Sequence, residues 1–157
     1  MSSTTETLKT TADELEFTAF YVDDLLLGID IRQVQEINRH LDTTEIPHAP
    51  DCVRGIINLR GEVVTVLDLR VIMGMDQRQI DEKSRNIIVR ADGENIGLLV
   101  DLIADVVVAP AREIESSPAN VSGVDSRFFE GIYKLKSGLM AILDVNEVVS
   151  AESGENR

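Results

Sequence analysis

The stretch from Arg54 to Leu69 predicts a β-hairpin followed by a short helix, and its pattern occurs twice in the chain. Two apolar, β-branched runs flank Arg60-Gly61, and glycine tolerates the positive φ of a tight hairpin turn. Asp68 ends the second run, where it can cap the helix. The pattern returns 76 residues later, pairing Gly55 with Gly131, Ile56 with Ile132, Leu59 with Leu135, Arg60 with Lys136, Leu67 with Leu143 and Asp68 with Asp144. This recurrence in one register predicts an internal duplication.

A second shift, of 69 residues, relates the N-terminal parts of the two halves. It pairs Gly28 with Gly97 and places Val34-Gln-Glu-Ile37 on Ile103-Ala-Asp-Val106. Each half then holds about five short strands, too few to bury both faces of an open sheet, whereas a closed barrel has no exposed strand edges. The sequence therefore predicts an all-β fold, mainly strands with short helices. Its two five-stranded β-barrel subdomains are related by internal duplication.

The linker-like composition of residues 75–84 sets the division that we expect between the subdomains. The expected boundaries are a flexible N-terminal tail at 1–15, a domain at 16–150 with subdomains at about 16–80 and 81–150, and a C-terminal tail at 151–157. Two continuous apolar runs, Ile87-Ile88-Val89 and Val106-Val107-Val108, predict strands that are covered on both faces. The second cover is either the sister barrel or a partner.

The net charge of −13 restricts the partners of this 157-residue chain. Such a charge repels phosphate backbones and anionic lipid heads, which argues against nucleic acid and membrane surfaces and favours a protein partner or a cation. The most apolar window, Ile96 to Val108, is interrupted by two aspartates and is too short to span a bilayer. Cys52 is the only cysteine and no secretion signal is visible, so we expect a cytoplasmic protein.

No constellation of residues in the sequence supports catalysis or metal binding. The best local cluster of metal ligands, His48, Asp51 and Cys52, lacks a second pair of ligands and is better explained as an ordinary loop. His40 has no nucleophile arranged near it, and the phosphate-binding and nucleophile-elbow motifs are missing. We therefore predict no enzymatic activity, no metal and no cofactor.

Arg60 has two interpretations that the residues alone leave open. It is either a solvated turn residue or a contact for a partner, because arginine beside apolar strand residues is enriched at the centres of interfaces. Val34 and Ile37 pose the same choice between core packing and an exposed contact.

Three motifs in their order and spacing identify a family that the chain resembles. They are Val34-Gln-Glu-Ile37, Arg54-Gly-Ile-Ile-Asn-Leu-Arg-Gly61 and Val66-Leu-Asp-Leu-Arg70. With them the chain resembles the CheW-like chemotaxis coupling family over roughly residues 15 to 150. The resemblance implies two intertwined SH3-like β-barrels without enzymatic activity. It also implies a scaffold that links the cytoplasmic tips of chemoreceptors to the histidine kinase CheA.

The resemblance also implies two binding surfaces. A receptor groove between the barrels would involve Val34, Gly55, Asn58, Arg60, Gly61, Gly97 and Ile103. A surface for the CheW-like regulatory domain of the kinase would involve Ile31 and Glu36. The second-half motif, Glu130-Gly-Ile-Tyr-Lys-Leu-Lys136, departs from the first, so we expect no second equivalent site.

The expected partners are thus the CheA regulatory domain and the cytoplasmic domains of chemoreceptors. The expected location is the cytoplasm, with recruitment to membrane-associated receptor arrays but no insertion into the membrane. Two alternatives stay open: a coupler for a pathway other than chemotaxis, such as surface motility, and a small ligand-binding barrel or enzyme that uses acidic residues and His48 around a cation.

Overall fold

The computed structural model describes residues 13–39 and 43–151 of the chain. The strands are β1 (Glu14–Val22), β2 (Leu25–Asp30), β3 (Val34–Arg39), β4 (Val53–Leu59), β5 (Glu62–Asp68), β6 (Arg85–Ala91), β7 (Glu94–Val100), β8 (Leu102–Pro110), β9 (Asn120–Val121), β10 (Val124–Asp125), β11 (Phe129–Leu135) and β12 (Gly138–Leu143). The helices are α2 (Leu69–Ile72) and α3 (Val145–Ala151), with short 3-10 turns η1 (Ile31–Gln33), η2 (Ala111–Glu113) and η3 (Ser126–Phe128). The expected mainly β fold with short helices is confirmed.

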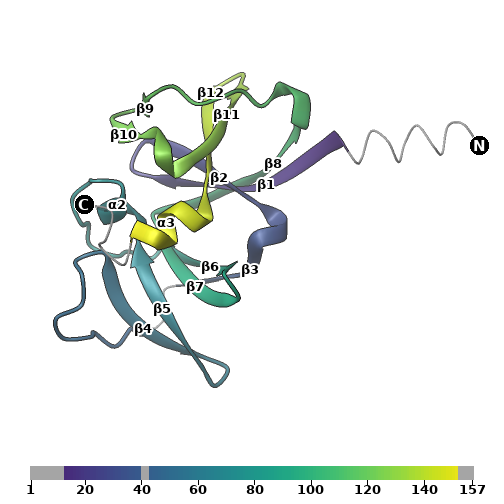
Figure 1. Cartoon of the computed structure of the whole chain (residues 1–157). Coiled ribbons are helices and arrows are strands. Elements are labelled where there is room, and N and C mark those ends of the chain that lie inside the picture. Colours follow the sequence, from purple (N-terminus) through teal and green to yellow (C-terminus); the bar gives the residue numbers. More distant parts are fainter. Residues whose placement is uncertain (1–12, 40–42, 152–157) are drawn as a thin grey trace, which may run out of the picture.

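Two five-stranded sheets form the body of the described chain (Figure 1). Barrel 1 has the strand order β11-β12-β2-β1-β8, and barrel 2 has the order β3-β6-β7-β5-β4. An isolated bridge between Glu115 and Ile132 links the chain after β8 back to β11. The bridge between Thr44 and Ile56 does the same between β3 and β4. These bridges curl each sheet toward closure, which reduces exposed edges.

The barrels do not follow the two halves of the sequence, so the expected division into 16–80 and 81–150 is wrong. Each half contributes its first hairpin to one barrel and its later strands to the other. Parallel pairing of β2 with β12 joins the β1–β2 hairpin to barrel 1, and parallel pairing of β7 with β5 joins the β6–β7 hairpin to barrel 2. A repeat in the sequence reveals which segments are equivalent, but it does not reveal which copy of the repeat a strand pairs with.

The tails also differ slightly from the expected boundaries. β1 begins at Glu14, so Glu14 and Leu15 belong to barrel 1, and Leu15 packs against its interior. At the other end α3 includes Ala151. The remainder of both predicted tails, residues 1–12 and 152–157, lies outside the described residues.

The duplication is visible in the backbone at Gly55 and Gly131. Each glycine follows a β-bulge, in the β4–β5 pair and in the β11–β12 pair respectively. A Cβ on Gly55 would collide with the carbonyl oxygen of Thr44, and a Cβ on Gly131 would lie 2.8 Å from that of Glu115. Glycine therefore permits the bridge that closes each sheet.

Both predicted helix caps are present. The side chain of Asp68 accepts a hydrogen bond from the N–H of Arg70 at 3.0 Å, and that of Asp144 accepts one from the N–H of Glu147 at 3.2 Å. These contacts satisfy backbone donors that the first helical turn leaves without partners. The strand-to-helix junctions of the two halves are thus built in the same way.

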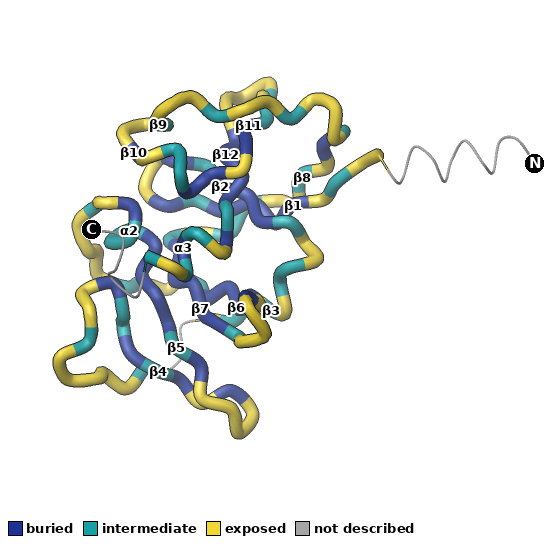
Figure 2. The backbone as a smooth tube through the Cα atoms, in the orientation of Figure 1, coloured by how far each residue is buried: buried dark blue, intermediate teal, exposed yellow. Residues whose placement is uncertain are grey.

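Three clusters of buried side chains make up the core. The largest contains residues of both barrels, among them Phe20 and Ile87, and lies between them. One smaller cluster fills the interior of barrel 2 and another fills that of barrel 1. Buried backbone accordingly gathers where the barrels meet (Figure 2). In β6, Ile87 and Val89 face the sister barrel and Ile88 faces the interior, which confirms that this strand is covered on both faces.

The run Val106-Val107-Val108 in β8 differs from this expectation. Val107 packs into the interior of barrel 1, but Val106 and Val108 are 55% and 47% exposed. No segment of the described chain buries this second face, so the sister barrel is not its cover.

Candidate functional site

The tip of the β4–β5 hairpin is a rigid turn that presents Arg60. Arg60 and Gly61 have φ angles of 53° and 87°, both in the left-handed region. The amide N–H of Gly61 donates to the side-chain oxygen of Asn58 at 2.9 Å, which closes the turn. Asn58 and Gly61 thus fix the backbone from which Arg60 projects.

Arg60 forms a two-point ion pair with Glu36 of β3. One guanidinium nitrogen donates to Glu36 Oε1 at 3.3 Å, and the other donates to Oε2. The Arg60 side chain is 72% exposed and that of Glu36 is 25% exposed. The hydrogen bond from Arg60 lowers the pKa of Glu36, and the carboxylate in turn raises the pKa of Arg60. The two residues that the resemblance assigns to different partners are therefore in direct contact.

Gly55 and Gly97 lie inside the protein, in close contact with neighbouring chain, and are not exposed to solvent. Both are buried, and Gly55 has the bridging role described above. A Cβ on Gly97 would lie 3.4 Å from the side chains of Ile88 and Val66, its neighbours in the barrel 2 sheet. These two glycines shape the site through the backbone.

Val34 and Ile103 lie at the junction of the barrels. Each is partly buried and packs against the core cluster between the barrels. Their strand partners are Val89 and Phe20, so the two residues occupy equivalent positions in the two halves. Ile31, in η1, is 40% exposed at the passage from β2 to β3. Apart from the two buried glycines, the predicted residues form two groups. Val34, Ile103 and Ile31 lie at the junction of the barrels. The hairpin-tip group consists of Asn58, Arg60, Gly61 and Glu36, which hydrogen bonds connect.

Exposed apolar side chains on β8 escaped the sequence analysis as site residues. Leu102, Val106 and Val108 are 40%, 55% and 47% exposed on the strand that also carries Ile103. The run of valines was noticed in the sequence, but apolar character alone does not show which face is covered. An exposed apolar surface of this kind is typical of a binding site.

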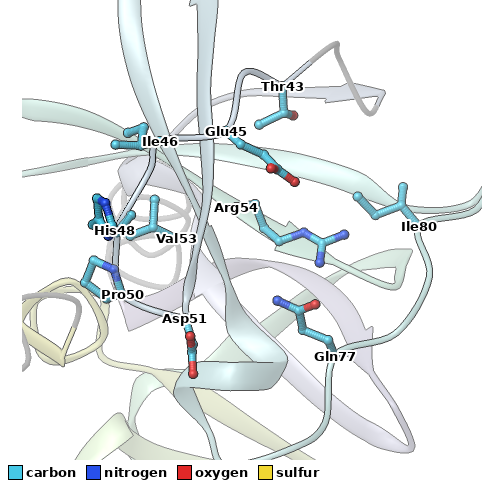
Figure 3. Close-up of a pocket in the computed structure, with 11 residues that line it drawn as sticks. Thr43, Glu45, Ile46, His48, Pro50, Asp51, Val53, Arg54, Gln77 and Ile80 are labelled. Carbon is cyan, nitrogen blue, oxygen red and sulfur yellow. The ribbon is translucent and has the colours of Figure 1, made fainter.

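A cavity with a volume of about 650 Å³ lies elsewhere, on barrel 2. Figure 3 shows Arg54 extending into it, with Glu45 and Gln77 on either side. Its lining residues are Thr43, Glu45, Ile46, His48, Ala49, Pro50, Asp51, Val53, Arg54, Gln77 and Ile80. None of the residues assigned to the receptor groove or the kinase surface lines this cavity. Among residues 13–39 and 43–151, no group of three or more acidic, histidine or cysteine side chains could hold a metal ion.

Arg54 links the cavity to the buried cap of α2. Its guanidinium lies 3.7 Å from the carboxylate of Asp68, whose side chain is 2% exposed. Burial raises the pKa of Asp68, and the positive charge of Arg54 opposes that rise. At the equivalent position in barrel 1, Glu130 replaces Arg54, and burial together with the carboxylates of Asp144 and Asp30 raises the pKa of Glu130. The two halves therefore share a fold but not their electrostatics.

Two interlocked five-stranded barrels, with an arginine-tipped hairpin and an exposed apolar strand, define a double-barrel module of the kind that binds proteins. The CheW-like domain matches residues 16–153. The chain belongs to the CheW-like family. In the described chain, no helix is both long and apolar enough to cross a bilayer.

Individual relatives agree with this assignment. The chain is 32% identical over 137 residues to the chemotaxis protein CheW of Bacillus subtilis, covering 87% of this chain and 88% of the relative. The crystal structure of the scaffolding protein TtCheW from Thermoanaerobacter tengcongensis matches with a TM-score of 0.80 and 34% identity, over 85% of this chain and 86% of that one. Protein FrzA of Myxococcus xanthus is 30% identical over 105 residues, covering 67% of this chain and 66% of FrzA.

Proposed function

We propose that this chain is a non-enzymatic scaffold that couples the cytoplasmic tips of chemoreceptors to the histidine kinase CheA. Family membership over nearly the whole described chain is the observation that carries the proposal. The solved relative is itself called a scaffolding protein, and several similar relatives are called chemotaxis proteins. In this role the chain works in the cytoplasm and is recruited to membrane-associated receptor arrays.

The proposed receptor surface combines the groove residues with the exposed strand β8. Arg60 supplies a charged hydrogen-bonding group on a fixed turn, whereas Val34 and Ile103 line the junction between the barrels. The adjoining side chains of Leu102, Val106 and Val108 offer apolar area for the apolar stripe of a receptor helix. Gly55, Asn58, Gly61 and Gly97 contribute by fixing the backbone.

The proposed kinase surface contains Ile31 and Glu36. Ile31 is an exposed apolar side chain, and Glu36 is a carboxylate held by Arg60. Because Arg60 already orders the Glu36 carboxylate, this side chain would lose less entropy on binding a partner. The contact between Glu36 and Arg60 makes the two proposed surfaces adjacent.

Reconstitution with both partners tests this function. The purified chain is mixed with a receptor cytoplasmic fragment and CheA, and co-sedimentation and kinase activity are measured. We expect the chain to sediment with both partners and to make kinase activity depend on the receptor fragment. Failure to bind either partner would contradict the proposal.

A coupler for a pathway other than chemotaxis is the second candidate function. The similarity to FrzA favours it, because that relative does not carry the name of a chemotaxis protein. Capture of the tagged chain from its own cells, followed by identification of the bound receptor and kinase, separates the two candidates. A bound kinase other than CheA would select the second.

A further inference from the structure

In the described part of the chain, the polypeptide passes from one barrel to the other at two places. The first is η1, between β2 of barrel 1 and β3 of barrel 2. The second is the single residue Asp101, between β7 of barrel 2 and β8 of barrel 1. These two passages are the covalent connections between the barrels in the described residues.

Four charged side chains surround the passage at Asp101: those of Arg70 and Asp101 are largely buried, whereas those of Asp23 and Arg78 are 56% and 46% exposed. Arg70 Nη1 lies 2.6 Å from Asp101 Oδ2, and the two side chains are only 12% and 13% exposed. The same carboxylate oxygen accepts a hydrogen bond from the amide N–H of Asp23 at 2.6 Å. Arg78 lies 3.8 Å from it, and Arg70 lies 3.6 Å from the Asp23 carboxylate. We call these four residues the clamp.

The members of the clamp come from both barrels. Asp23 lies in the turn between β1 and β2 of barrel 1. Arg70 lies in α2, which follows β5 of barrel 2, and Arg78 lies in the segment that leads to β6. Arg70 also donates to the backbone oxygen of Asp76 at 2.9 Å, which fixes that segment. The clamp therefore joins a hairpin turn of one barrel to the helix and linker of the other.

The passage at η1 is held differently. Its ion pair joins Arg32 to Asp30 at 2.7 Å, within two residues of chain, and the Arg32 side chain is 76% exposed. Such a local, exposed pair carries little energy and connects nothing across the barrels. The polar contacts that connect the two barrels at a passage are therefore those at Asp101, and not those at η1.

A buried ion pair is better suited to fixing one arrangement than to adding stability. Desolvation of the charges offsets much of their attraction, but an arrangement that separates them leaves an uncompensated buried charge. Movement of the β7–β8 passage away from α2 would do this to Arg70. The passage also lies between Gly97 and Ile103, two of the residues assigned to the receptor groove.

We propose that Arg70 and Asp101 are positioning residues that set the orientation of the two barrels and, through it, the shape of the groove between them. The assignment of that groove to receptors rests on the proposed function. The orientation of the barrels can be measured without any partner. The role of Arg70 and Asp101 and the assignment of the groove to receptors can therefore fail separately.

The test uses Asp101→Asn, which removes the charge but keeps an oxygen that can accept from Asp23. The double variant Arg70→Met/Asp101→Asn leaves no buried charge without a partner, and so guards against a simple folding failure. Glu115→Gln is the matched control. It also replaces a carboxylate by an amide, but in an exposed ion pair with Lys134 that does not connect the two barrels. Residual dipolar couplings are measured for each barrel, and the dissociation constant is measured for a receptor cytoplasmic fragment.

In the wild type and the control, we expect the couplings of both barrels to fit one shared alignment tensor. In the two clamp variants, we expect the tensors of the barrels to diverge and the dissociation constant to rise about tenfold. A shared tensor in both clamp variants, or diverging tensors with unchanged affinity, would overturn the proposal. If the wild type does not bind the receptor fragment, the proposed function fails, and the tensor comparison alone decides the role of the clamp.

Discussion

The guanidinium of Arg60 pairs with the carboxylate of Glu36 across 24 positions of sequence, which fastens the β4–β5 hairpin tip to β3. One member belongs to the proposed receptor surface and the other to the proposed kinase surface. A partner that draws either side chain away leaves the other without its ion pair. Under the proposed function, the pair would be a direct physical route from receptor binding to the kinase contact.

Reversal of the charge at Arg60 should disrupt partner binding but not the fold. Because the Arg60 side chain is mostly exposed, Arg60→Glu should leave Tm within about 2 °C of the wild type. We expect the dissociation constant for the receptor fragment to rise at least about tenfold, since a negative charge beside Glu36 replaces a cation at the interface. Thermal unfolding and titration calorimetry measure the two effects.

The double variant Glu36→Arg/Arg60→Glu separates two explanations of that loss. It restores an ion pair with reversed charges, so binding should recover if only the pair matters and stay weak if Arg60 itself contacts the receptor. The proposed surface predicts the second result. A large fall in the Tm of Arg60→Glu would instead show that Arg60 is structural.

Gly55 offers a test of whether a proposed groove residue acts through the backbone. A Cβ there collides with the Thr44 carbonyl at a φ of 140°, so Gly55→Ala should destabilise the protein by about 3 kcal/mol. Gly61→Ala is the control, because at Gly61 only the positive φ opposes a side chain, for about 1 kcal/mol. Urea denaturation measures both changes. A stable Gly55→Ala variant that no longer binds receptors would show that Gly55 is a contact residue.

Local features of this fold could be predicted from the sequence because each depends on a few neighbouring residues. The hairpin turn at Arg60-Gly61 and the caps at Asp68 and Asp144 are examples, and the structure contains all three. The duplication was also predictable, since equivalent backbone positions such as Gly55 and Gly131 require the same residue.

The exchange of hairpins between the barrels was not predictable from the repeat alone. β2 could pair with a strand of either copy without any change in the apolar pattern, and only the tertiary structure shows that it pairs with β12. The contact between Glu36 and Arg60 and the clamp at Asp101 depend on that same arrangement. Charge and spacing along the chain carry no signal for contacts between such distant residues.

Glu130 and Glu36 should give opposite pH dependences of stability. The pKa of Glu130 is raised by burial and by Asp144 and Asp30, so its favourable contribution is present below pH 4.5 and is lost as the pH rises through its folded pKa. The pKa of Glu36 is lowered by Arg60, so its contribution is present above pH 4.5 and is lost as the pH falls through its folded pKa.

Urea denaturation of the wild type, Glu130→Gln and Glu36→Gln at a series of pH values measures these dependences. Relative to Glu130→Gln, the wild type should lose stability as the pH rises above 4.5. Relative to Glu36→Gln, it should lose stability as the pH falls below 4.5. Slopes of the same sign for the two comparisons would show that one of these environments is wrongly assigned.

The two faces of β8 should respond differently to the same substitution. Val106 is 55% exposed, whereas Val107 pairs with Phe17 and packs with it in the interior of barrel 1. We expect Val107→Asp to destabilise the protein by roughly 2 kcal/mol or more, because it places a carboxylate among apolar side chains. Val106→Asp should leave the free energy of unfolding nearly unchanged and yet weaken receptor binding, because the exposed apolar face is the proposed contact. Denaturation and receptor titration of both variants distinguish a binding face from an ordinary surface. Normal receptor binding by a stable Val106→Asp variant would remove β8 from the proposed receptor surface.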